Sequence, residues 1–417
     1  MQLKGRASGL SARAGILPAL IVALAGYLPI SSAVPGPLVS PRASRIPLTV
    51  DSWTYQLQGY SASMQTLGDS KFDLLVIDYS EFGDGGSEFT AQQIANLKDS
   101  PCGDRPVVAY MSIGEAESYR YYFDSNWIGP DNQPIPGTAP DWLGPPNPGF
   151  TNNYKVKYWM AGWQAIIFGD TSGADKSYLD RIIDAGFDGV YLDIIDAFEY
   201  WGPTENGGND TNRDSAAGMV DFVRALAQYA RQTRGKPDFI VIPQNGTGLI
   251  ADWTYPDAAD PVAEAAAQKQ RYFEVIDGVG AEDTFFFGPA DNDNPLDPQT
   301  ETIALLDEFA AAGKVVLAID YVTQTAKIRT FHEMARARRY KPYATVRDLD
   351  VMTVSAGYEP VCRWLEYWVG DAGARGLTDF TRTWPRIARR TRPELDHRRK
   401  LWGEAIWRRE PSSASTP

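Results

Sequence analysis

Short apolar runs recur along the chain, and several of them end on an acidic residue. The best defined is GFDGVYLDIID, residues 186–196, in which Val190, Tyr191 and Leu192 lead directly into Asp193, with Asp196 three positions later. An unbroken apolar run bounded in this way is typical of a parallel strand that is buried on both faces. The pattern therefore predicts a buried strand that ends at two carboxylates.

Seven other runs complete a predicted set of eight strands. They are residues 53–58, 74–80, 106–115, 156–163, 239–246, 275–287 and 315–322. Helical spacing of apolar residues occurs between them, at residues 92–97, 178–185 and 215–234. Alternating strands and helices in this number predict an α/β fold, a (β/α)8 TIM barrel that forms a single catalytic domain. A doubly wound open sheet is the alternative.

The two ends of the chain differ from this pattern. Residues 1–33 have a basic start, an apolar run and small residues at 31–33, which predicts a signal peptide and a secreted protein, with an uncleaved membrane anchor as the alternative. Residues 34–51 contain four prolines and are interpreted as a linker. The barrel domain is assigned to residues 52–355. Residues 356–417 form a basic tail, which is either flexible or a binding module.

Composition narrows the class of protein. With 417 residues, of which 43% are hydrophobic and 22% charged, the chain is typical of a soluble globular protein. Its net charge is −13, which repels nucleic acid and attracts cations, although solubility alone is a simpler explanation. We expect a monomer that binds no nucleic acid and, once the signal is removed, no membrane. The aromatic content of 12% is compatible with rings in a sugar-binding cleft or in a large core.

The chain has so few histidines and cysteines that several kinds of catalytic and metal site are excluded. The chain has two histidines, His332 and His397, and two cysteines, Cys102 and Cys362. Zinc sites with several histidine ligands and thiolate metal clusters are therefore excluded, and a Ser-His-Asp hydrolase would depend on one of the two histidines. The remaining chemistry is that of carboxylates. The cysteines form either one long-range disulfide or two free core thiols.

The predicted barrel places the carboxyl ends of its strands on one rim, where active sites of this fold lie. The polar residues expected there are Asp78, Glu115, Asp193, Gln244, Asn245, Glu282 and Asp320. A pair of carboxyl groups in one cleft suits glycoside hydrolysis, because one stays protonated to assist the leaving oxygen while the other stays ionised. Several acids can instead hold Mg²⁺ or Ca²⁺. We expect neither metal nor cofactor, since the chain has no tight Asp-x-Asp cluster.

Seven motifs in order connect these residues to a known family. They are LLVIDYS, AYMSIGEAESYRYY, VKYWMAGW, GFDGVYLDIIDAFEYW, IPQNG, GVGAED and IDYV. Together they span about residues 53–350, and the chain closely resembles glycoside hydrolase family 114. The resemblance implies a secreted endo-α-1,4-polygalactosaminidase with a (β/α)8 barrel and an Asp and a Glu as the catalytic pair. Asp193 in LDIID matches the Asp; the Glu is assigned to Glu282 in GVGAED, with Glu115 in SIGEAE as the rival.

We therefore expect a secreted glycoside hydrolase that cleaves α-1,4 linkages in a galactosamine-containing polysaccharide. Asp193 would be the nucleophile and Glu282 the general acid/base, which assumes retention. Supporting contacts with the sugar are expected from Asp78, Tyr110, Glu115, Trp159, Trp163, Asp196, Gln244, Asn245, Asp320 and Tyr321, with core packing as the alternative for the aromatic rings. A polymer of free galactosamine is cationic, which suits an acidic protein. The alternatives are a polysaccharide-binding barrel without activity, and an enzyme acting on a different polymer.

Overall fold

The computed structural model describes residues 44–362, apart from 48, 170–175, 209–211, 252, 254, 256 and 257. The predicted signal peptide and most of the predicted linker and tail lie outside these residues. The chain divides into two units, residues 1–361 and 362–417, and the helices and strands below belong to the first. Within the described part, no helix combines the length and the apolar character that crossing a membrane requires.

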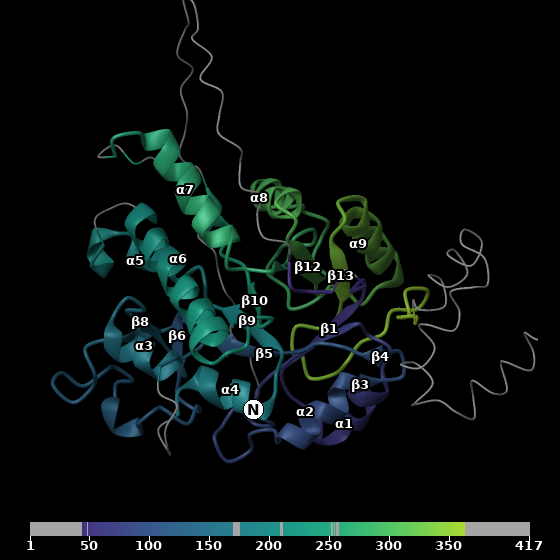
Figure 1. The fold of residues 1–417 in the computed structure, drawn as a ribbon, viewed down its shortest axis with the longest axis horizontal. Coiled ribbons are helices and arrows are strands. Elements are labelled where there is room, and N and C mark those ends of the chain that lie inside the picture. The colour runs from purple at the N-terminus through teal and green to yellow at the C-terminus, as the bar shows by residue number, and fades with distance from the viewer. Residues whose placement is uncertain are drawn as a thin grey trace, which may run out of the picture. The chain divides into compact units, whose positions relative to one another are not determined.

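Eight parallel strands form the centre of the first unit (Figure 1). In order they are β1 (Trp53–Gln56), β2 (Leu74–Ile77), β5 (Val107–Ser112), β9 (Gly189–Asp193), β10 (Ile240–Pro243), β11 (Gly278–Glu282), β12 (Val315–Asp320) and β13 (Lys341–Ala344). Hydrogen bonds join the first five in one sheet and the last three in another. A parallel bridge between Gln244 and Gly280 connects β10 to β11. Between β13 and β1, the indole N–H of Trp53 donates to the carbonyl of Lys341 at 2.8 Å. The strands close into a (β/α)8 barrel, which confirms the predicted fold class.

A helix follows each of the first seven barrel strands. These helices are α1 (Tyr60–Asp69), α2 (Ala91–Lys98), α4 (Tyr178–Ala185), α6 (Asn212–Gln228), α7 (Pro261–Phe273), α8 (Thr300–Ala311) and α9 (Thr325–Ala337). Shorter helices are α3 (Ala161–Ile167), α5 (Ala197–Trp201) and the 3-10 turns at Ser125–Trp127, Thr204–Asn206 and Thr247–Ile250, and a π turn at Tyr229–Thr233 continues α6. Two antiparallel additions are the hairpin β3 (Asp99–Ser100) with β4 (Gly103–Asp104), and a sheet of β6 (Glu115–Glu117), β8 (Asn153–Val156) and β7 (Leu143–Pro146) in the connection after β5.

One predicted strand is wrong. Residues 156–163 contain the end of β8 and the start of α3, and the eighth barrel strand is β13. Two rings of this segment, those of Tyr158 and Trp163, are buried outside the barrel interior, and Trp159 is exposed. Trp163 donates its indole N–H to the carbonyl of Ile113 at 2.8 Å, and Tyr158 donates its hydroxyl to the carbonyl of Ser215 at 2.7 Å. The strand β13 escaped the pattern because Lys341 and Pro342 interrupt its apolar run.

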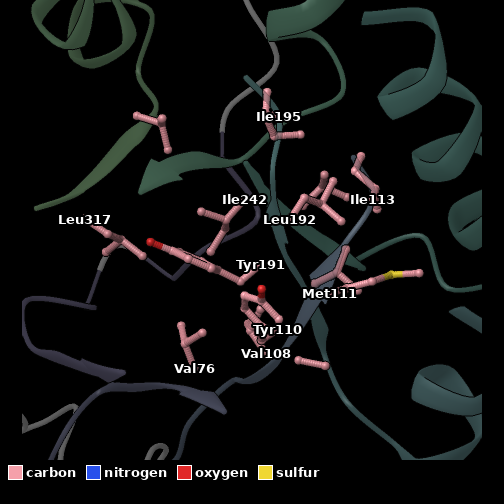
Figure 2. Close-up of a cluster of buried hydrophobic side chains, with 14 of the residues drawn as sticks. Val76, Val108, Tyr110, Met111, Ile113, Tyr191, Leu192, Ile195, Ile242 and Leu317 are labelled. Atoms are coloured by element: carbon pink, nitrogen blue, oxygen red, sulfur yellow. The ribbon is translucent and has the colours of Figure 1, made fainter. Parts of the chain in front are cut away.

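Aromatic side chains fill the barrel interior. The ring centroids of Trp53 and Tyr55 lie 6.3 Å apart, those of Tyr55 and Tyr191 5.1 Å, and those of Trp53 and Tyr343 5.6 Å. A Cβ at Gly280 would lie 1.8 Å from the Tyr191 hydroxyl, so β11 needs a glycine beside this ring. Figure 2 shows Tyr191 surrounded by aliphatic side chains from neighbouring strands. These rings belong to the core rather than to a cleft.

The cysteine alternatives are also decided. Neither Cys102 nor Cys362 is a free thiol in the structure. The interpretation of two free core thiols is therefore wrong.

Candidate active site

Asp193 is the last residue of β9 and lies at the carboxyl end of the barrel. Its Oδ2 accepts a hydrogen bond from the hydroxyl of Tyr110 at 2.7 Å, and its Oδ1 accepts one from the amide of Ile194 at 2.8 Å. Ile194 has a φ of 57°, which is unusual for a β-branched residue. A strained backbone conformation of this kind persists only where the surrounding structure holds it, and such residues cluster at functional sites.

Glu282 occupies the equivalent position at the end of β11. Asn245 bonds it twice: its amide donates to Glu282 Oε2 at 3.0 Å, and its Oδ1 accepts the backbone N–H of Glu282 at 3.0 Å. The hydroxyl of Tyr321, which follows β12, donates to Glu282 Oε1. Both oxygens of Glu282 are thus held by donors from the two neighbouring strands.

The two carboxyl groups influence each other electrostatically. Burial raises the pKa of Asp193 to about 8, and the negative charge of Glu282 adds to the rise, while the hydrogen bonds from Tyr110 and Ile194 oppose it. A carboxyl group with a pKa near 8 keeps its proton at neutral pH. The arrangement therefore places two carboxyl groups at the same end of the barrel, of which Asp193 is protonated at neutral pH in the free protein.

This raised pKa predicts how stability depends on pH. The unfolded chain releases the Asp193 proton near pH 4, whereas the folded protein keeps it until about pH 8, so the stabilisation present below pH 4 is lost as the pH rises through 8. The variant Asp193→Asn has no proton to release at this position, so its stability does not fall for this reason as the pH rises. The Asn variant should therefore gain stability relative to the wild type as the pH rises from 4 to 8, and this gain in the free energy of unfolding should be on the order of 5 kcal/mol. Urea unfolding at both pH values measures this difference, and equal differences would contradict it.

Three predicted residues contact the pair directly, and a fourth, Gln244, precedes one of them in the chain. Tyr110 and Tyr321 donate to the two carboxyl groups, and Asn245 holds Glu282. Gln244 is buried just below and accepts a hydrogen bond from the Tyr55 hydroxyl at 3.1 Å. The structure brings these side chains together, as expected for adjacent strand ends.

Two predicted acids are instead turned into the protein. Asp78 pairs with the buried Arg120 at 2.8 Å. Asp320 is fully buried and accepts the backbone N–H of Phe286 at 3.1 Å, and burial raises its pKa to about 8. Their carboxyl oxygens contact groups in the connections that follow β5 and β11.

Glu115, Asp196 and Trp159 lie on the side of the site formed by the connection after β5. Glu115 is buried on β6 and accepts hydrogen bonds from Lys155 at 3.1 Å and Asn147 at 2.8 Å, and burial raises its pKa. Asp196 is exposed at the start of α5. Trp159 is 46% exposed and packs edge-on against Trp201, with 5.4 Å between ring centroids. The other stacking candidate, Trp163, is buried, so the core-packing alternative applies to it.

Sequence reasoning missed two arginines that support the site. Arg347 lies with its guanidinium 4.0 Å from the centroid of the Tyr321 ring, and Arg120 holds Asp78. Arg347 lies three positions after the strand that the pattern did not find, near the end of residues 53–350, the span of the family resemblance. Within the described residues, no three acidic, histidine or cysteine side chains are grouped as a metal site would require.

Comparison with known proteins places the chain among carbohydrate-active enzymes. A family model described as glycoside-hydrolase family GH114 matches residues 37–365. An uncharacterized protein of Thermotoga maritima is 34% identical over 322 residues, which cover 74% of this chain and 85% of that protein. An uncharacterized protein of Deinococcus radiodurans is 31% identical over 348 residues, covering 81% and 96%.

Two solved structures are similar at low identity. The glycoside hydrolase domain of PelA from Pseudomonas aeruginosa has 16% identity and a TM-score of 0.47, over 73% of this chain and 98% of that one. The glycoside hydrolase domain of PgaB (BpsB) from Bordetella bronchiseptica has 11% identity and a TM-score of 0.42, over 72% and 95%.

Proposed function

The chain belongs to glycoside-hydrolase family GH114, and on that premise we propose that it is a secreted enzyme that cleaves α-1,4 linkages within a galactosamine-containing polysaccharide. The observation that carries the proposal is the pair Asp193 and Glu282. Both end barrel strands at the same rim, and each accepts a hydrogen bond from a tyrosine hydroxyl. Secretion is supported by the signal-like pattern of residues 1–33.

The proposed reaction has two steps. Asp193 attacks the anomeric carbon while Glu282 gives its proton to the leaving oxygen, and the glycosidic bond breaks. Glu282 then takes a proton from water, which hydrolyses the glycosyl-Asp193 ester. A galactosamine ammonium bound beside Asp193 lowers the raised pKa of this carboxyl group and so favours the ionised form that the attack requires.

The surface around the pair supports a polymeric, cationic substrate. Within the described residues, the exposed Phe and Trp side chains are Phe82, Trp159 and Phe287, with exposed fractions of 69%, 46% and 41%. All three lie in connections that leave the carboxyl ends of barrel strands, namely β2, β5 and β11. Aromatic faces at a cleft suit the apolar faces of sugar rings. The net charge of −13 favours a cationic polymer.

Incubation of the secreted protein with three polymers tests this function. The substrates are partially deacetylated poly-α-1,4-galactosamine, the fully acetylated polymer, and anionic polygalacturonate as a charge control, with released oligosaccharides measured by mass spectrometry. We expect a ladder of internal fragments from the deacetylated polymer. Binding of this polymer without fragments would favour a polysaccharide-binding protein, and fragments from polygalacturonate alone would overturn the cationic substrate.

A further inference from the structure

Arg347 connects the loop after β13 to the segment that follows Glu282. Its Nη2 lies 2.8 and 2.7 Å from the two carboxyl oxygens of Asp283, and its Nε donates to the carbonyl of Asp291 at 3.1 Å. The backbone N–H of Arg347 donates to Asn292 Oδ1 at 3.0 Å. These contacts hold Asp283 in a left-handed conformation, with a φ of 49°, directly after Glu282.

The same guanidinium also covers the tyrosine that contacts Glu282. It lies 4.0 Å from the centroid of the Tyr321 ring, and Tyr321 is 3% exposed, with its hydroxyl donating to Glu282 Oε1. A cation at this distance over an aromatic face is attracted to the ring. Arg347 therefore reaches Glu282 by two routes, through the Tyr321 ring and through the Asp283 backbone.

We propose that Arg347 is a positioning residue that holds Tyr321 and the Glu282–Asp283 turn in the geometry that proton donation by Glu282 requires. The inference rests on the proposed function, since it assigns a part in that reaction. A guanidinium is suited to the task because its planar group can face a carboxylate with its edge and a ring with its face. A lysine ammonium cannot do both.

The effect on chemistry follows from the charges around Glu282. The titratable or charged groups that interact with it are Tyr55 on β1, Tyr191, Asp193 and Asp196 on or after β9, Asp283 after β11, Tyr321 after β12, and Arg347 after β13. Arg347 supplies the positive charge in this set. When Glu282 gives its proton to the glycosidic oxygen and the C–O bond breaks, the Tyr321 hydrogen bond and this cation stabilise the carboxylate that remains.

The test compares two substrates that differ in their need for an acid. One is the galactosamine polymer, and the other is a galactosamine oligosaccharide with a 4-nitrophenyl group, which leaves without protonation. In Arg347→Met we expect kcat on the polymer to fall by about 10²-fold and kcat on the nitrophenyl substrate by less than about fivefold. The alkaline limb of kcat/KM on the polymer should move upward by about half to one pH unit, because Glu282 loses a nearby cation.

Arg347→Lys separates charge from geometry. It should keep the alkaline limb near the wild-type pH, because a cation remains, but should still lower kcat on the polymer, because the planar contacts are lost. Arg338→Met is the matched control. Arg338 also pairs with an aspartate, Asp307, which accepts a hydrogen bond from the Tyr340 hydroxyl at 2.7 Å. These residues lie before β13, at the end of the barrel opposite Glu282. The rates and pH profile of this control should equal those of the wild type.

Several outcomes would overturn the inference. Equal losses on both substrates with an unchanged pH profile would assign Arg347 a structural role only, as would wild-type rates in both Arg347 variants. If Arg347→Met does not fold, Arg347→Lys alone decides between a selective loss on the polymer and an equal loss. A wild-type protein that cleaves neither substrate would overturn the proposed function together with this inference, whereas normal wild-type cleavage isolates the role of Arg347.

Discussion

Asp193→Asn and Glu282→Gln should each lower kcat on the galactosamine polymer by at least about 10³-fold. Asn cannot form the glycosyl ester, and Gln has no proton to donate to the leaving oxygen. Both substitutions keep the shape of the side chain, so the contacts from Tyr110, Asn245 and Tyr321 have partners of similar size. Loss of activity should therefore occur without loss of folding, which circular dichroism and thermal unfolding can verify.

Azide distinguishes the two roles. In Asp193→Ala, azide can replace the nucleophile and should give a glycosyl azide of inverted configuration; in Glu282→Ala, azide attacks the glycosyl-enzyme and should give a product of retained configuration. Glu115→Gln is the matched control, because Glu115 is a buried acid on the same side of the barrel that bonds Lys155. Near wild-type activity in Glu282→Gln, with activity lost in Glu115→Gln, would transfer the acid/base role to Glu115.

Arg120→Met should destabilise the protein by about 3 to 5 kcal/mol. Arg120 is 3% exposed and pairs with Asp78 at 2.8 Å and with Glu117 at 2.6 Å, both of them buried. Methionine fills a similar volume but leaves two buried carboxyl groups without a counter-charge. The free energy of unfolding in urea measures the loss. The loss should shrink at acid pH as Asp78, whose pKa is raised by burial, becomes protonated.

Two further variants test the cause of this loss. Combining Arg120→Met with Asp78→Asn and Glu117→Gln should recover much of the stability, since no buried charge then remains unpaired. Arg224→Met removes the partner of Asp221 at the surface and should change stability by less than about 1 kcal/mol. A loss in Arg120→Met as small as that in Arg224→Met would contradict the interpretation of Arg120 as a buried counter-charge.

Local sequence was sufficient for the fold class and the family. Uninterrupted apolar runs such as Val190–Leu192 are possible only where both faces of a strand are buried, so their alternation with helical spacing indicated a parallel barrel. The family resemblance is confirmed by the match over residues 37–365. Asp193 was singled out because it follows such a run directly, whereas Glu282 was chosen over Glu115 through the family resemblance; the structure puts both Asp193 and Glu282 at the carboxyl end of the barrel.

The strand β13 shows where this reasoning stops. Its sequence contains Lys341 and Pro342, which interrupt the apolar pattern. Its place in the barrel comes from pairing with β12 and from the contact of Lys341 with Trp53, 288 positions earlier in the chain. Because the strand was missed, so was Arg347 behind it. Such pairings depend on which segments meet in space, and no local pattern records them.

The sequence by itself determined that buried strands end on acidic residues; only the tertiary structure decided which of those acids stay partly exposed at the carboxyl end of the barrel. Asp78 and Asp320 have the same local signature as Asp193. They are nonetheless buried, because Arg120 and the amides of Phe285 and Phe286, each more than thirty positions away, satisfy their oxygens from inside the protein. A carboxylate can be enclosed in this way only where folding supplies such partners, since burying an unpaired charge costs more free energy than burial of the side chain returns.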